Sequence, residues 1–134
     1  MIGKLDDYFR FNETALSLRT ERQRVLASNI ANADTPNYKA RDFNFSDALQ
    51  NALHGPGPAQ LNKTDGNHLE AANVGPGGVP LLFRPEGQGA VDGNTVEMDL
   101  ERTQFADNAL RYEASVTFLN SQIRSLMAAI TGGQ

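Results

Sequence analysis

The sequence predicts a mainly α-helical protein, in which long N- and C-terminal helices pair as an antiparallel, coiled-coil-like layer. Nine of the 12 Gly and five of the six Pro fall in one loop-rich middle segment, which has room for short β-strands. Both flanks are almost free of Gly and Pro and place apolar side chains at helical spacing. We therefore divide the single unit 1–134 into an N-terminal helix (3–32), a turn with a short helix (33–54), a Gly/Pro-rich segment (55–93) and a C-terminal heptad helix (94–131).

Composition restricts the possible functions. The chain has 134 residues and a formal charge of -4, with basic residues spread rather than clustered, which argues against a nucleic-acid surface. It has no cysteine, and therefore no disulfide, thiolate metal site or cysteine nucleophile. No segment has the apolar core of a cleaved signal peptide or the length of a membrane span. By these rules the protein is cytosolic unless a route without a cleaved signal exports it.

The N-terminal helix carries two apolar stripes. The broad stripe contains Leu5, Tyr8, Phe9, Ala15, Leu16, Leu26, Ala27 and Ile30. The narrow stripe lies well off it and contains Phe11, Leu18 and Val25. Because one stripe suffices for a two-helix hairpin, the second stripe indicates packing against more than one neighbour.

This helix is followed by an unusually polar stretch, ASNIANADTPNYKARDF, at residues 27–43. Asn32 is expected to end the helix because Asn tolerates left-handed geometry. Residues 35–38 are expected to form a type I or II turn with Asn37 at positive φ, and Asp34 to bond the turn backbone. Any one of these residues is explained by a well-made helix stop. The whole string predicts a fixed exit angle for the chain, with Tyr38 and Arg41 facing outward.

The middle of the chain is less regular. A short helix is expected from Ser46, as its N-cap, to His54, with Gly55 after it. QLNK, GVPLLFR and GAV are candidate strands, of which LLF is the strongest. Disorder in part of residues 55–78 is an equally good interpretation.

The C-terminal helix is the clearest element in the sequence. Asn94 or Thr95 is expected to cap it. A 4,3,4,3 spacing then runs without a break through Met98, Arg102, Phe105, Ala109, Tyr112, Val116, Leu119, Ile123, Leu126 and Ile130. This heptad seam predicts a long partner helix, which the N-terminal helix provides.

Apolar surface is left over when these two helices pair. Burying a large apolar side chain contributes about 1.5–3 kcal/mol, and a chain of this length has little stability to spare. The leftover stripes are therefore expected to contact other subunits. A closed three-helix bundle with some exposed apolar residues is the alternative from the pattern alone.

No residue pattern indicates an enzyme. His54 and His68 stand in loop-like sequence without carboxylates at metal-ligand spacing. The acids Glu97, Asp99 and Glu101 suit the first turn of a helix, where they complement the dipole. Ser28 and Ser115 lack a histidine-centred constellation, and no Gly-rich phosphate loop is present. We expect no catalytic residue, no metal and no cofactor.

The stretch ASNIANADTPNYKARDF resembles the N-terminal signature of the flagellar axial proteins, which comprise rod, hook and hook-associated proteins. LDDYFRFNETALSLRTERQRVLASNIANADTP is similar to the start of a rod protein of this family. PLLFRPEGQGAVDGNTVEMD is similar to its approach to the last helix, and GNTVEMDLERTQFADNALRYEASVTFLNSQIRSLMAAI to its end. The likeness covers residues 1–54 and 79–134. Asn37 stands where the family usually has Gly.

The resemblance implies a structural subunit of the proximal rod of the bacterial flagellar basal body. Such a subunit is exported by the flagellar type III apparatus without a cleaved signal and polymerises helically in the periplasm, where it transmits torque and lines the export channel. The implied partners are copies of itself, other rod proteins, and a FliE-type adaptor with the MS-ring and export-gate region, and no nucleic acid or small-molecule substrate. The alternatives are a non-polymerising helical-hairpin secretion substrate or adaptor with one partner and, more weakly, a small enzyme.

On this interpretation, two sets of residues are expected to act in assembly. The seam residues Phe105, Tyr112, Val116, Leu119, Ile123, Leu126 and Ile130 pack mainly on Leu5, Phe9, Leu16, Leu26 and Ile30, while Phe11, Leu18 and Val25 contact neighbouring subunits. The signature turn, comprising Asn29, Asn32, Asp34, Thr35, Pro36, Asn37 and Tyr38, sets where the chain leaves the helical layer.

Overall fold

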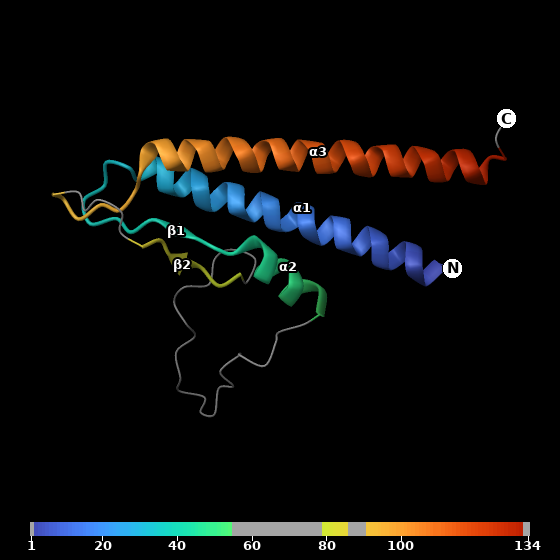
Figure 1. The fold of residues 1–134 in the computed structure, drawn as a ribbon, viewed down its shortest axis with the longest axis horizontal. Coiled ribbons are helices and arrows are strands. Elements are labelled where there is room, and N and C mark those ends of the chain that lie inside the picture. Colours follow the sequence, from blue (N-terminus) through green and yellow to red (C-terminus); the bar gives the residue numbers. More distant parts are fainter. Residues whose placement is uncertain (1, 55–78, 86–90, 133–134) are drawn as a thin grey trace, which may run out of the picture.

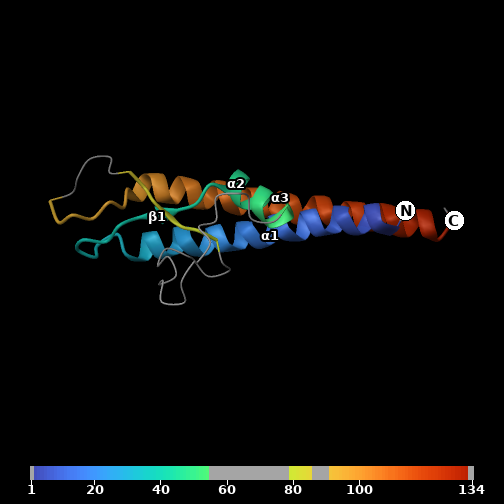
Figure 2. The ribbon, with the colours of Figure 1, turned by 90° about the horizontal axis from the view of Figure 1, so that it is seen from below.

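The computed structural model describes residues 2–54, 79–85 and 91–132. The described elements are α1 (Ile2–Ala31), β1 (Arg41–Asp42), α2 (Phe45–His54), β2 (Leu82–Phe83) and α3 (Met98–Ile130). Helices α1 and α3 run antiparallel along each other, so that the two chain ends lie at the same end of the molecule (Figures 1 and 2). The expected mainly helical fold with paired terminal helices is confirmed.

Helix α1 is the central layer of the described structure. It contacts α3 on one side, and α2 and β1 on the other. Its two apolar stripes explain this position, because each stripe has a different set of partners. The first residues of the chain and the last turns of α3 extend beyond the middle elements, so there only the two helices cover each other (Figure 1).

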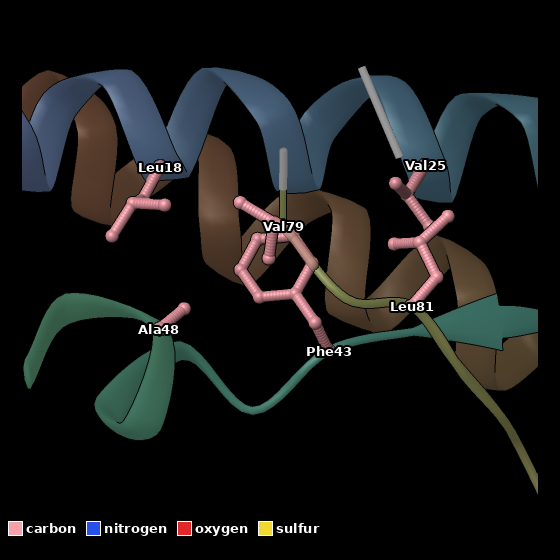
Figure 3. Packing of buried hydrophobic residues seen from close by; sticks show 6 residues of the cluster. All are labelled: Leu18, Val25, Phe43, Ala48, Val79 and Leu81. Atoms are coloured by element: carbon pink, nitrogen blue, oxygen red, sulfur yellow. The ribbon is translucent and has the colours of Figure 1, made fainter. Parts of the chain in front are cut away.

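The middle elements form the main hydrophobic cluster against the narrow stripe of α1. Leu18 and Val25 lie buried there against Phe43, Ala48, Val79 and Leu81, with Phe45 and Leu49 packed at the edge (Figure 3). The expectation that Leu18 and Val25 contact neighbouring subunits is therefore wrong. The sequence pattern did not reveal that the loop-rich segment would supply its own apolar cover. Phe11, from the same stripe, is exposed.

The strand predicted at LLF is confirmed as β2, which pairs antiparallel with β1 in the register Arg41↔Phe83 and Asp42↔Leu82. Strand β1 was not expected, because two residues are too few to show an alternating pattern. The candidate strand QLNK lies outside the described residues, as does most of GAV.

The helix starts differ from the expected caps. Asn44 caps α2: its Oδ1 accepts hydrogen bonds from the N–H groups of Ser46 (3.0 Å) and Asp47 (3.3 Å), so Ser46 is not the cap. Helix α3 begins at Met98 after Glu97, whose side chain makes no capping hydrogen bond. Asn94 and Thr95 do not cap α3 because their side chains bind other segments.

The heptad seam of α3 is partly rotated from the expected one. Phe105, Leu119 and Leu126 are half-buried, as predicted, but Ala109, Ile123 and Ile130 are exposed. The covered positions beside the first set are polar and recur every seven residues: Glu101 and Asn108 are buried, and Ser115 and Gln122 are half-buried. The side of α3 that faces α1 thus combines one apolar and one polar column. Ile123, Met127 and Ile130, spaced by four and three residues, form a second apolar column whose side chains are exposed.

Truncating a buried side chain of α1 tests this packing. Leu26 has no exposed surface, so Leu26→Ala should lower the free energy of unfolding by about 2–5 kcal/mol in urea titrations. Leu110→Ala is the matched control, since Leu110 on α3 is 67% exposed, and it should change stability by less than about 0.5 kcal/mol. Equal losses in both variants would contradict the assignment of the two faces.

Candidate functional site: the corner of the hairpin and its open faces

The turn after α1 has the geometry that its sequence predicts. The N–H of Tyr38 donates to the carbonyl of Thr35 (3.3 Å), and Asn37 between them has a φ of 60°, as in a type II turn. Asn37 is the one non-glycine residue of the described chain at positive φ. Gly93 lies beside it with a φ of 74°, which favours glycine, and a Cβ at that position would stand 2.6 Å from Asn37 Oδ1.

Asn94 closes the end of α1. Its Nδ2 donates to the carbonyls of Asn32 (3.0 Å), Ala33 (2.8 Å) and Thr35 (2.8 Å), while its Oδ1 accepts from the N–H of Val96 (2.8 Å). Carbonyls after the last turn of a helix have no partner within the helix. The carboxamide of a residue 59–62 positions later therefore supplies the cap, and the approach to α3 is bound to the end of α1.

Asn29 binds the returning chain from inside α1. It is completely buried, and its Oδ1 accepts from the N–H of Arg41 (3.1 Å) and the hydroxyl of Tyr38 (3.3 Å). Its Nδ2 donates to the carbonyl of Arg41 (2.7 Å) and to Glu101 Oε2 (3.2 Å). One side chain thus holds the signature turn, β1 and α3.

Other expectations for the signature turn need correction. Tyr38 folds back onto α1 rather than facing outward, and Arg41 lies over the ring of Phe83 at 5.3 Å. Asn32 has no left-handed φ; its Nδ2 donates to the carbonyl of Ser28 instead (2.8 Å).

Asp34 and Pro36 stay on the surface of the turn. Within the described residues the carboxylate of Asp34 makes no hydrogen bond, so it does not form the expected Asx motif. The hydroxyl of Thr35 donates to Asn32 Oδ1 (3.1 Å), and this bond takes the place of that motif.

Four charged side chains meet behind the corner. Arg22 binds Asp42 through two bonds, Nε to Oδ1 (3.1 Å) and Nη2 to Oδ2 (3.0 Å). Arg84 donates from Nη2 to Asp42 Oδ2 (2.9 Å) and from Nη1 to Glu101 Oε1. Gln104 on α3 also accepts from Arg22 Nη2 (3.0 Å). The cluster has two positive and two negative groups, so it is neutral when all four are ionised.

The pKa values of the two carboxylates are shifted in opposite directions. Burial alone would raise the pKa of Asp42, but the hydrogen bonds and charge of Arg22, the N–H of Phe43 and a bond from Arg84 outweigh it and lower that pKa. Burial raises the pKa of Glu101, and the bond from Asn29 with the charge of Arg84 offsets this only in part. Glu101 is therefore the member of the cluster whose ionised form is least favoured.

Asn108, two helical turns after Glu101 on α3, sets the register between α3 and α1. This buried side chain donates to the carbonyl of Arg19 (2.9 Å) and to Gln23 Oε1 (2.7 Å) on α1. A shift of α3 by one turn would take the buried carboxamide of Asn108 away from these two partners. As in coiled coils with polar core positions, the polar column fixes how the helices align.

Beyond the corner, the paired helices expose apolar side chains. On α1 these are Leu5 and Phe11, and on α3 they are Leu100, Leu110, Tyr112, Phe118, Ile123, Met127 and Ile130. Of the other expected packing residues, Phe9, Leu16, Ile30 and Val116 are half-buried. Scattered exposed apolar residues are normal, but contiguous ones along a helix mark a surface for protein contact.

The described part of the chain offers little for small-molecule chemistry. No group of three His, Cys, Asp or Glu side chains there could hold a metal ion. None of the described helices combines the length and the apolar composition that crossing a bilayer requires. His54 is exposed at the end of α2, and His68 lies outside the described residues. Glu101 lies in the first turn of α3, as expected, and its carboxylate binds Arg84.

Comparison with known proteins agrees with the signature. Residues 9–39 match the profile of the family described as flagella basal body rod protein. The chain is 46% identical over 138 residues to flagellar basal body rod protein FlgB of Yersinia ruckeri, covering 99% of this chain and 100% of the relative. It is 45% identical over 137 residues to that of Salmonella typhimurium and 44% identical over 137 residues to that of Escherichia coli K12, with 99% of each chain covered.

Substitutions at Asn37 test the turn geometry. Left-handed backbone costs a residue with a Cβ roughly 1–2 kcal/mol. Asn37→Gly should therefore retain or slightly raise the free energy of unfolding, whereas Asn37→Ala should lower it by about 1 kcal/mol. Asp34→Ala, an exposed substitution in the same turn, is the control and should have little effect. An Asn37→Gly variant less stable than Asn37→Ala would rule out the positive φ as the reason for Asn at this position.

The charge cluster predicts opposite pH effects for its two acids. The lowered folded pKa of Asp42 means that its stabilising contribution is present above the unfolded pKa and is lost as pH falls through the folded value. The raised folded pKa of Glu101 means that its contribution is present below the unfolded pKa and is lost as pH rises through the folded value.

Urea unfolding from about pH 3 to about pH 8 measures both contributions. Relative to the unsubstituted protein, Asp42→Asn should remove part of the loss of stability on acidification. Glu101→Gln should remove part of the loss as pH rises above the ordinary Glu range. Parallel pH curves for Glu101→Gln and the unsubstituted protein would contradict the raised pKa.

Proposed function

The chain belongs to the FlgB family of flagellar basal body rod proteins, and on that premise we propose that the open apolar faces of α1 and α3 pack on neighbouring subunits of the rod. The protein is a structural component of the basal-body rod rather than an enzyme. The observation that supports the proposed packing is the second apolar column of α3, formed by Ile123, Met127 and Ile130, in which Met127 is 60% and Ile130 83% exposed.

The hydrophobic effect favours burial of this apolar column of α3 in the assembled rod. Burying each of these side chains contributes about 1.5–3 kcal/mol, and the described chain has no element on that side of α3. An apolar face on α3 that meets a different face of the next copy gives a heterologous contact. Such a contact generates an open helical filament when the rotation between successive copies does not close into a ring.

The apolar residues of the expected assembly set divide by exposure. Leu18, Val25 and Leu26 are buried within the subunit. Leu5, Phe11, Tyr112, Ile123 and Ile130 are exposed, and we assign them to contacts between subunits. Phe9, Leu16, Ile30, Phe105, Val116, Leu119 and Leu126 are half-buried, and we assign them to the α1–α3 seam.

The position and partners of the subunit are further parts of the proposal. We place it in the periplasm at the proximal end of the rod, in contact with copies of itself, other rod proteins, a FliE-type adaptor and the MS-ring and export-gate region. These assignments rest on the resemblance of the two terminal segments to rod proteins. The absence of cysteine is compatible with export without a cleaved signal.

A charge on the open column tests assembly separately from folding. Met127→Asp should leave the circular dichroism and urea stability of the purified monomer nearly unchanged, because the side chain of Met127 is 60% exposed. In a strain that lacks the native gene, the same variant should fail to restore swimming or rods in isolated basal bodies. Ser121→Asp, on an exposed polar position of α3, should restore both.

Leu119→Asp should give the contrasting result. Because Leu119 is half-buried, this variant should lose both monomer stability and assembly. If Met127→Asp restores normal rods, the open column is not an assembly surface. If the protein forms only a discrete dimer or heterodimer and the deletion strain still builds rods, the partner-binding hairpin is the correct interpretation.

A further inference from the structure

The charge cluster joins segments that are far apart in the chain. Arg22 belongs to α1, Asp42 to β1 and Glu101 to α3, while Arg84 directly follows β2 and donates its N–H to the carbonyl of Ala40 (2.9 Å). The backbone bond and the side-chain bonds of Arg84 therefore form together when β2 docks. No other described element brings a cation into hydrogen-bond contact with Glu101.

The charge balance depends on Arg84. The side chain of Glu101 has no exposed surface, and those of Arg84, Asp42 and Arg22 are 17–18% exposed. From α1, Glu101 receives only the neutral carboxamide of Asn29, while Arg22 is directed at Asp42 and Gln104. Without Arg84, two enclosed carboxylates would share one guanidinium. Leaving a buried charge uncompensated costs more than an ion pair contributes.

We propose that Arg84 is a latch that couples the docking of β2 to the closing of the α1–α3 hairpin at its corner. In the unlatched chain, the first turns of α3 cannot lie against α1, because this contact encloses Glu101 without a counter-charge. When β2 pairs with β1, Arg84 binds both carboxylates and with Arg22 balances their charge, and the β1–β2 pair and the hairpin close as one unit. The far ends of the helices, where no middle element packs, do not depend on the latch.

The latch differs from an ordinary stabilising ion pair in two ways. Its loss should open the corner and leave the far half of α3 unchanged. The effect of losing the latch should also be reversed by any change that removes the charge of Glu101, either protonation or substitution by Gln. The charged groups that face Glu101 are Arg84, Arg22 and Asp42, and the neutral group is Asn29. When Glu101 is protonated, Asp42 is therefore the one negative charge left in the cluster.

Hydrogen exchange of backbone amides in the full-length chain tests the proposal. Arg84→Met should lower the protection of residues 101–108 by about tenfold or more near pH 7.5, with residues 119–130 unchanged. The double variant Arg84→Met/Glu101→Gln should recover most of that protection. After correction for the intrinsic pH dependence of exchange, the protection of Arg84→Met should also recover as the pH is lowered, because burial raises the pKa of Glu101 and favours its protonated form. Arg111→Met is the matched control, because Arg111 pairs with Asp107 on the exposed side of the same helix and should change nothing.

The double variant separates charge from packing. Equal loss of protection in the single and double variants would overturn the latch, since Arg84 would then act through strand docking or side-chain packing. Full protection in Arg84→Met would overturn it as well. If Arg84→Met does not fold at neutral pH, recovery of folding by Glu101→Gln supports the latch, and failure to recover contradicts it.

Discussion

Asn29 has no contact with water, so its carbonyl oxygen and both amide hydrogens must find partners inside the protein. These partners are the backbone of Arg41 and the hydroxyl of Tyr38 on the returning chain, and the carboxylate of Glu101 on α3. The end of α1, the strand that returns along it and the start of α3 are thus held at one point. The cluster around Asp42 is joined to this point, because Glu101 binds both Asn29 and Arg84.

The elements of the fold followed from local patterns. The clustering of Gly and Pro marks the middle segment, and uninterrupted helical periodicity marks the two flanks. The turn at residues 35–38 was predictable because Pro and Asn restrict their own backbones. Likewise, Phe105, Leu119 and Leu126 keep the seam position that their spacing indicates.

The polar contacts between distant segments were not predictable in the same way. Asn94 resembles a helix cap in the sequence, and only its position beside the end of α1 reveals that it caps that helix instead. Glu101 resembles an ordinary first-turn acid, and nothing local indicates that Arg84 will enclose it. For Leu18 and Val25, the periodicity identified a second buried stripe correctly but could not say whether the cover came from the same chain or from a neighbour.

The two ends of the hairpin are chemically unlike. One end is a closed corner whose buried side chains Asn29 and Asn94 bind other segments of the chain, and the other carries both chain termini and two helix ends (Figure 1). The subunit is therefore polar along its long axis and has no internal two-fold symmetry. Labels fused to either terminus mark the same pole, so a single tag reports the polarity of the subunit within any array. A label attached at the exposed turn residue Asp34 marks the opposite pole.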